Sequence, residues 1–81
     1  MELSIITPNE TADYVIEWIE LNTPTGNIVI QPGHTPMILI LESDKPAVFR
    51  LENGTQESIT VRQGIADIRR DRATLVINET V

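Results

Sequence analysis

Residues 47–62, with the sequence AVFRLENGTQESITVR, contain the strongest local fold signal in the chain. Two runs rich in β-branched and apolar residues, 47–51 and 57–62, flank the dipeptide Asn53-Gly54. An Asn-Gly pair between two such runs is the strongest short-range signal for a β-hairpin, because a type I′ turn needs positive φ at both central residues. We therefore expect an antiparallel hairpin here, with positive φ at Asn53 and at Gly54.

Similar turn signals recur on both sides of this hairpin, at the spacing of about 8–12 residues that is typical of a sandwich or barrel. No window keeps a helical stripe of apolar residues with a cap at each end. The sequence therefore predicts one all-β domain over residues 1–81 with no substantial helix. The expected strands are 3–7, 14–21, 27–30, 36–41, 47–51, 57–62, 65–69 and 73–78.

The second expected strand has apolar residues on both of its faces. Strict alternation along 14–21 would place Val15, Ile19 and Leu21 on one face. It would place Ile16 and Trp18 on the other face. A strand of this kind is either central in a sheet or covered by something else.

Composition excludes several classes of protein. The chain has 81 residues, 41% of them hydrophobic, which suits one folded domain and is too apolar for a disordered segment. It has no cysteine, which excludes disulfides, a thiolate nucleophile and a cysteine zinc site. The net charge of −6 argues against nucleic acid as a partner. No secretory signal pattern is visible, and the longest apolar run, 37–41, is far shorter than the ~20 residues of a membrane helix.

The charges are unevenly distributed along the chain. Residues 1–44 include seven acidic residues and no Lys or Arg, whereas all six basic residues lie in 45–81. This asymmetry could orient a partner, or it could simply give a solvated acidic surface.

The chain offers few groups for catalysis. His34 is the only histidine, and no nucleophile-elbow pattern accompanies Ser43 or Ser58. The loop acids Glu42 and Asp44 could touch a divalent ion, but loop acids are common in acidic proteins. We expect no catalytic residue, no metal site and no cofactor. We expect the ring of His34 to bond nearby backbone or to contact a partner.

Residues 25–37, with the sequence TGNIVIQPGHTPM, resemble the G-E-[IL]-G-I-x-P-G-H-A-P-L signature of the epsilon subunit of F-type ATP synthases. Residues 3–8 resemble the first strand of that family. Residues 58–78, which include VRQGIADI at 61–68, resemble its V-x-G-G-F-x-E-V segment and last strand. The resemblance is collinear and covers nearly the whole chain.

This resemblance implies a sandwich of about ten short, mostly antiparallel strands. It implies a non-catalytic rotor subunit that docks on the gamma subunit and on the c-ring and couples ion-driven rotation to ATP synthesis. Such a subunit lies at the cytoplasmic face of the bacterial inner membrane, without inserting into it. The family positions carried over to the gamma side are Thr7, Gly33, His34, Thr35 and Pro36, and those carried over to the c-ring side are Asn27 and Glu42.

The chain departs from the family pattern at several positions. Asn27 stands where relatives usually have Glu near the c-ring, and Val29 stands where glycine is frequent. Typical bacterial relatives continue into a C-terminal helical hairpin, whereas this sequence ends at Val81. A natural short form and a truncated chain both fit, and the short form is the expectation.

A stand-alone sandwich that binds a peptide or carbohydrate is the alternative function. It would present Tyr14 and Trp18 together at the surface beside a groove, because sugar binders use aromatic platforms. The rotor hypothesis predicts instead an exposed apolar patch on one face, which an obligate partner would cover.

Overall fold

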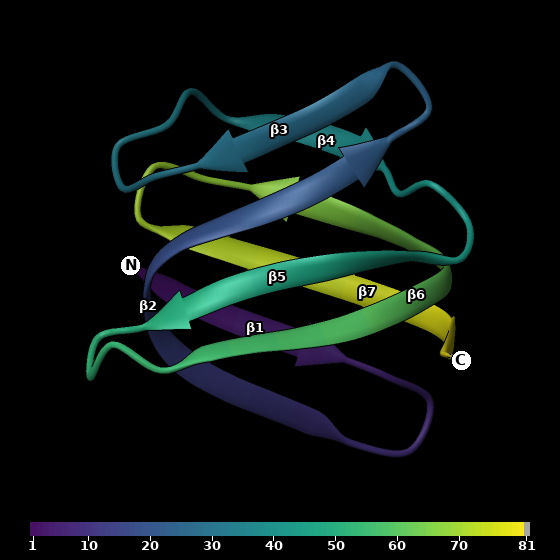
Figure 1. Ribbon diagram of the computed structural model, residues 1–81, viewed down its shortest axis with the longest axis horizontal. Coiled ribbons are helices and arrows are strands. Elements are labelled where there is room, and N and C mark those ends of the chain that lie inside the picture. Colours follow the sequence, from purple (N-terminus) through teal and green to yellow (C-terminus); the bar gives the residue numbers. More distant parts are fainter. Residues whose placement is uncertain (81) are drawn as a thin grey trace.

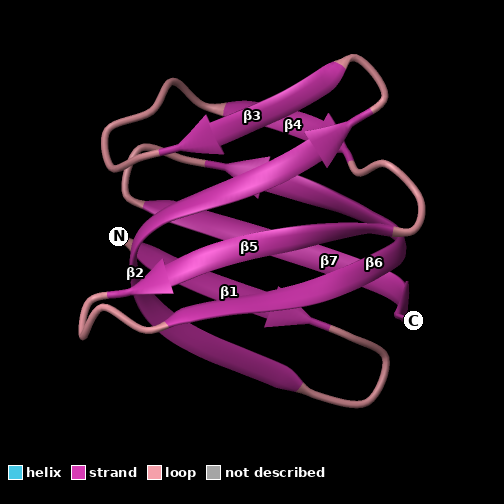
Figure 2. Cartoon of the chain, viewed as in Figure 1, coloured by secondary structure: helices cyan, strands magenta, loops and turns pink. Residues whose placement is uncertain are grey.

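The computed structural model describes residues 1–80, and this range forms seven strands and no helix (Figure 1, Figure 2). The expected all-β class is confirmed, but the expected number of about ten strands is too high. The reason is that β2 and β6, each 13 residues long, run through both layers of the fold. The strands are β1 (Glu2–Ile6), β2 (Thr11–Thr23), β3 (Gly26–Ile30), β4 (Met37–Ile40), β5 (Lys45–Leu51), β6 (Gln56–Ile68) and β7 (Arg72–Thr80).

The strand register divides the fold into two layers that face each other (Figure 1). The front layer contains β3, residues 16–23 of β2, β5 and residues 56–61 of β6. The back layer contains residues 11–15 of β2, β1, β7, residues 64–68 of β6, and β4. All pairs are antiparallel except β1 with β7, which joins the two ends of the chain in one ladder.

A bulge in β2 marks the point where this strand passes from the back layer to the front layer. The register of β2 against β5 shifts between Ile16 and Trp18, which leaves Glu17 as an extra residue. Strict alternation is broken there, so Ile16 and Ile19 both face the interior, at 1% and 0% exposed. Val15 is 52% exposed whereas Ile19 is buried, so the expectation that the two share one face was wrong.

The β6 strand has a similar irregularity where it changes layer. The register against β7 shifts on both sides of Gln63. The two separate strands expected at 57–62 and 65–69 are therefore one strand. Gln63-Gly64, whose sequence predicts a bend or a bulge, forms the irregularity within it.

The hairpin around Asn53-Gly54 forms as expected, but its turn is not type I′. Gly54 has φ 92°, and Asn53 is not among the residues with positive φ. The Gly54 amide donates to the Leu51 carbonyl at 2.9 Å, and the Thr55 amide donates to Oδ1 of Asn53 at 2.9 Å. The loop is thus longer than two residues, and a longer hairpin loop needs only one left-handed residue.

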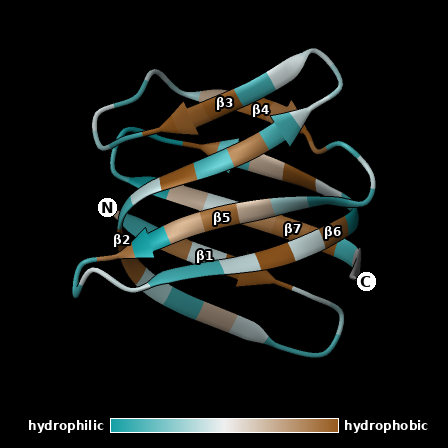
Figure 3. Ribbon diagram, in the orientation of Figure 1, coloured by the Kyte–Doolittle hydropathy of each residue, from teal (hydrophilic) through white to brown (hydrophobic). Residues whose placement is uncertain are grey.

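The core lies between the two layers. Hydrophobic and hydrophilic residues alternate along parts of the strands (Figure 3). Tyr14 packs its ring against Phe49 of the other layer, with centroids 5.1 Å apart. The largest fully buried side chains come from five of the seven strands: Leu3, Ile16, Ile19, Leu21, Ile30, Val61, Ile68, Leu75 and Ile77.

Candidate docking face

The outer face of the back layer has a row of apolar side chains, one from each of four neighbouring strands. Ile6 of β1 lies opposite Val76 of β7, which lies opposite Ile65 of β6. Ile65 in turn lies opposite Ile40 of β4. Directly opposite residues point to the same side of a sheet, and Ile38, two positions before Ile40, shares that side. We call Ile6, Ile38, Ile40, Ile65 and Val76 the apolar patch.

The apolar patch is accessible to solvent. Ile38 and Ile40 are 69% and 68% exposed, and Ile65 and Ile6 are 43% and 37% exposed. Beside them the surface forms a hollow of about 360 Å³, lined by Ile40, Gln63, Gly64, Ile65, Val76 and Asn78. Contiguous exposed apolar side chains are characteristic of interaction sites.

The sequence of β4 explains why the patch forms at this edge. Met37 and Leu39 pack against the core, so Ile38 and Ile40 must point outward. A strand that buries one face needs apolar residues only at alternate positions. The uninterrupted apolar run 37–41 is therefore the sequence signal that locates the patch at β4.

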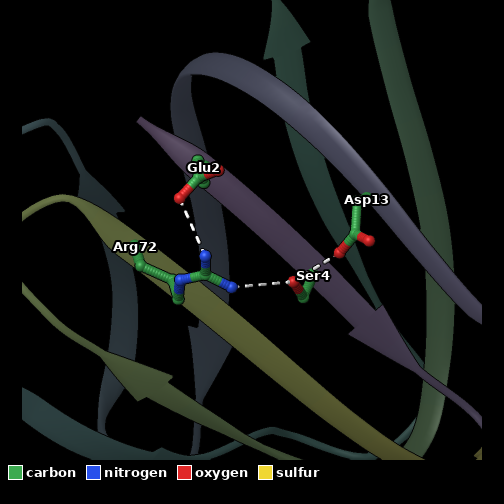
Figure 4. Close-up of polar contacts among 4 residues, drawn as sticks. All are labelled: Glu2, Ser4, Asp13 and Arg72. Atoms are coloured by element: carbon green, nitrogen blue, oxygen red, sulfur yellow. Dashed lines mark hydrogen bonds and ion pairs between the residues drawn. The ribbon is translucent and has the colours of Figure 1, made fainter.

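A polar group lies on the same outer face, further along β1 and β7 (Figure 4). Nη2 of Arg72 donates to Oε2 of Glu2 at 2.8 Å, and Nη1 donates to Oγ of Ser4 at 3.4 Å. The Ser4 hydroxyl donates to Oδ1 of Asp13 at 2.6 Å. Three neighbouring strands, β7, β1 and β2, are therefore linked by side chains. These residues border a hollow of about 260 Å³ lined by Glu2, Leu3, Ser4, Asp13, Tyr14, Val15 and Arg72.

The residues expected on the gamma side lie at two ends of the back layer. Thr7 directly follows Ile6, and its side chain accepts from the Glu10 amide at 3.3 Å. Residues 33–36 form the loop that leads into β4, at the opposite end of β1 from Thr7. The Gly33 amide donates to the carbonyl of Arg70 at 2.6 Å, which fixes this loop beside the β6–β7 turn.

His34 bonds nearby backbone, as expected. Its Nδ1 atom lies 2.8 Å from the carbonyl oxygen of Thr35. A carbonyl oxygen can only accept, so this hydrogen bond needs the proton on Nδ1.

The two residues expected on the c-ring side lie close together. Nδ2 of Asn27 donates to Oδ1 of Asn22 at 3.2 Å, and the Glu42 amide donates to the Asn22 carbonyl at 2.8 Å. Asn22 also donates to the Pro46 carbonyl at 3.1 Å. Asn27 and Glu42 therefore share one end of the molecule, beside the β2–β3 turn.

Tyr14 and Trp18 do not form a joint aromatic platform. Tyr14 packs against the core, whereas Trp18 alternates with the buried Ile19 and so lies on the outer side of the front layer. Within the described part of the chain, no group of three or more His, Asp or Glu residues could hold a metal ion. Residues 1–80 also include no helix long and apolar enough to cross a membrane.

The fold and the apolar patch together define a class of protein. It is a small two-layer β-sandwich with an apolar patch on the outer face of one layer. A sequence model of the family described as "ATP synthase, Delta/Epsilon chain, beta-sandwich domain" matches residues 1–81. The chain belongs to this family, and the resemblance based on residues 25–37 is thereby confirmed.

Named relatives support the same family membership. The chain is 32% identical over 78 residues to the ATP synthase epsilon chain of Bacillus licheniformis, covering 94% of this chain and 57% of the relative. It is 27% identical over 79 residues to that of Nostoc punctiforme, covering 96% and 58%. The chain thus spans less than two thirds of the length of these relatives.

Two solved structures have the same fold. The central stalk/c-ring structure of the Tetrahymena thermophila mitochondrial ATP synthase contains a chain that matches with a TM-score of 0.82 at 17% identity. The match covers all of this chain and 65% of that one. A chain of the Euglena gracilis mitochondrial ATP synthase matches with a TM-score of 0.84 at 17% identity, covering 98% and 51%. At this identity the likeness shows the fold alone.

Proposed function

We propose that residues 1–81 form a single non-catalytic rotor domain of an F-type ATP synthase. In this proposal the domain docks on the gamma subunit and the c-ring and couples ion-driven rotation to ATP synthesis. Membership of the family supports it, as do relatives named ATP synthase epsilon chain. The fold is also shared with chains of solved ATP synthase assemblies.

The apolar patch is the observation that best supports a contact with the gamma subunit. Four strands contribute side chains to the patch. Its most exposed side chains are Ile38 and Ile40, at 69% and 68% exposed. Fully burying one such side chain contributes about 1.5–3 kcal/mol, so a partner that covers this face gains stability from it. Thr7 and Pro36 adjoin this face, since Thr7 follows Ile6 and Pro36 precedes β4. We assign the face and the loop residues Gly33, His34, Thr35 and Pro36 to the gamma side.

The c-ring contact is assigned to the end of the molecule that holds Asn27 and Glu42. Both surround Asn22, and Asn27 is exposed. In this proposal the domain reaches the cytoplasmic face of a bacterial inner membrane only through its protein partners.

A binding titration against the gamma subunit of the same organism tests the gamma assignment. Ile40→Asp places a charge within the apolar patch, and we expect binding to weaken by about 30-fold or more. Val29→Asp is the matched control. Val29 is also an exposed apolar residue on an edge strand, 45% exposed, but it lies in the front layer.

Tight one-to-one binding that is lost in Ile40→Asp and kept in Val29→Asp would support the proposal. Equal losses in both variants would contradict the assignment of the face. Absence of binding by the unmodified folded chain would contradict the rotor function itself.

A further inference from the structure

Asp13 differs from the other carboxylates on the outer face of the back layer. Glu2 is paired with Arg72 at 2.8 Å, and Asp67 is paired with Arg69 at 3.1 Å. Asp13 accepts a hydrogen bond from the Ser4 hydroxyl, but no basic nitrogen of the described residues lies within 4 Å of its carboxylate. Its carboxylate therefore has no direct ion pair within this part of the chain, and Arg72 reaches it only through the Ser4 hydroxyl.

Asp13 also lies beside the apolar patch. It is directly opposite Ser4, and Ile6 is two positions beyond Ser4 on the same face of β1. Asp13 and Ile6 are thus diagonal neighbours across two paired strands, which places their side chains within reach of one partner surface. The hollow of about 260 Å³ next to Asp13 leaves space for a side chain to enter.

The contacts around Asp13 hold its carboxylate in place. Ser4 is only 7% exposed, so its hydroxyl is a fixed donor, and the bond to Oδ1 of Asp13 is 2.6 Å long. Arg72 cannot easily move over to neutralise Asp13, because it already donates to Glu2 and to Ser4 (Figure 4). Asp13 itself is exposed.

A partner that covers the apolar patch would also remove water from Asp13. Desolvating an unpaired carboxylate costs several kcal/mol, whereas a desolvated and hydrogen-bonded charge pair can favour binding. We propose that the partner on this face presents a basic side chain, Lys or Arg, which enters the hollow and pairs with Asp13. This inference rests on the proposed function, since it names the chemistry of the partner at the same face.

The test uses the unmodified chain and two variants in titrations against the gamma subunit. Asp13→Asn removes the charge but keeps an Oδ1 acceptor for the Ser4 hydroxyl, so the fold should be undisturbed. We expect it to weaken binding about 30-fold or more, because the partner's cation is left buried and unpaired. Glu20→Gln is the matched control, since Glu20 lies on the outer side of the front layer between Val29 and Val48.

Salt dependence and thermal unfolding complete the test. Raising NaCl from about 0.05 M to about 0.5 M should weaken binding of the unmodified chain more than binding of Asp13→Asn, because one charge pair is missing in the variant. Equal melting temperatures of the three proteins would show that the loss of binding does not arise from unfolding.

The possible outcomes separate this inference from the proposed function. If the unmodified chain binds and Asp13→Asn binds equally well, the cation pairing is wrong and the gamma assignment stands. If Glu20→Gln loses as much affinity as Asp13→Asn, the effect is one of net charge and the pairing is again wrong. If the unmodified chain does not bind, both proposals fail.

Discussion

Gly64 occupies a position where the structure leaves no space for a side chain. A Cβ atom there would lie 2.8 Å from the carbonyl oxygen of Val76 and 3.3 Å from Cα of Ile77. Both neighbours are backbone atoms of the paired strand β7, which cannot rotate away. Glycine is therefore needed for close approach rather than for positive φ, and it lies where β6 passes between the layers.

Replacing Gly64 by Ala should destabilise the domain by about 1–3 kcal/mol, because β6 and β7 must move apart to admit the methyl group. Urea unfolding of the variant checks this. Gln63→Ala, at the exposed neighbouring position, should change the free energy of unfolding by less than about 0.5 kcal/mol. A Gly64→Ala variant as stable as the parent would show that the two backbones are not in such close contact.

At the scale of the element, most strand positions follow from turn residues and β-branched runs. Which residues of β2 point into the core does not follow from them. Residues 14–21 place apolar side chains on both faces under strict alternation, so the sequence does not show which residue is the extra one. The bulge is imposed by the change of layer, where β2 leaves β1 and pairs with β5. A strand expected to have two apolar faces in fact has one interior face that shifts by one residue at Glu17.

This shift predicts a difference between two adjacent residues. Ile16→Ala should cost about 2–5 kcal/mol, because Ile16 is fully buried and its removal leaves a cavity. Val15→Ala should cost less than about 1 kcal/mol, because Val15 is 52% exposed. Thermal or urea unfolding of both variants checks the order. A larger cost at Val15 would restore strict alternation and contradict the bulge.

At the scale of the whole molecule, the all-β class, the family and the presence of an exposed apolar patch could be predicted from the sequence, whereas the residues that form the patch could not. Residues 25–37 were sufficient for the family. The patch joins Ile6, Ile40, Ile65 and Val76, which lie far apart in the chain and become neighbours only through the β1–β7, β6–β7 and β4–β6 registers. The parallel β1–β7 pair is a contact between chain ends, and no local sequence pattern specifies it.

Hydrogen exchange of the chain, alone and bound to the gamma subunit, tests the central claim most directly. The two strands to compare are β4 and β3, which are edge strands of the back and front layers. If the outer face of the back layer is the docking face, exchange at Met37–Ile40 should slow on binding while exchange at Gly26–Ile30 stays unchanged. Slower exchange at Gly26–Ile30 alone, or equal exchange at β4 with and without gamma, would contradict it.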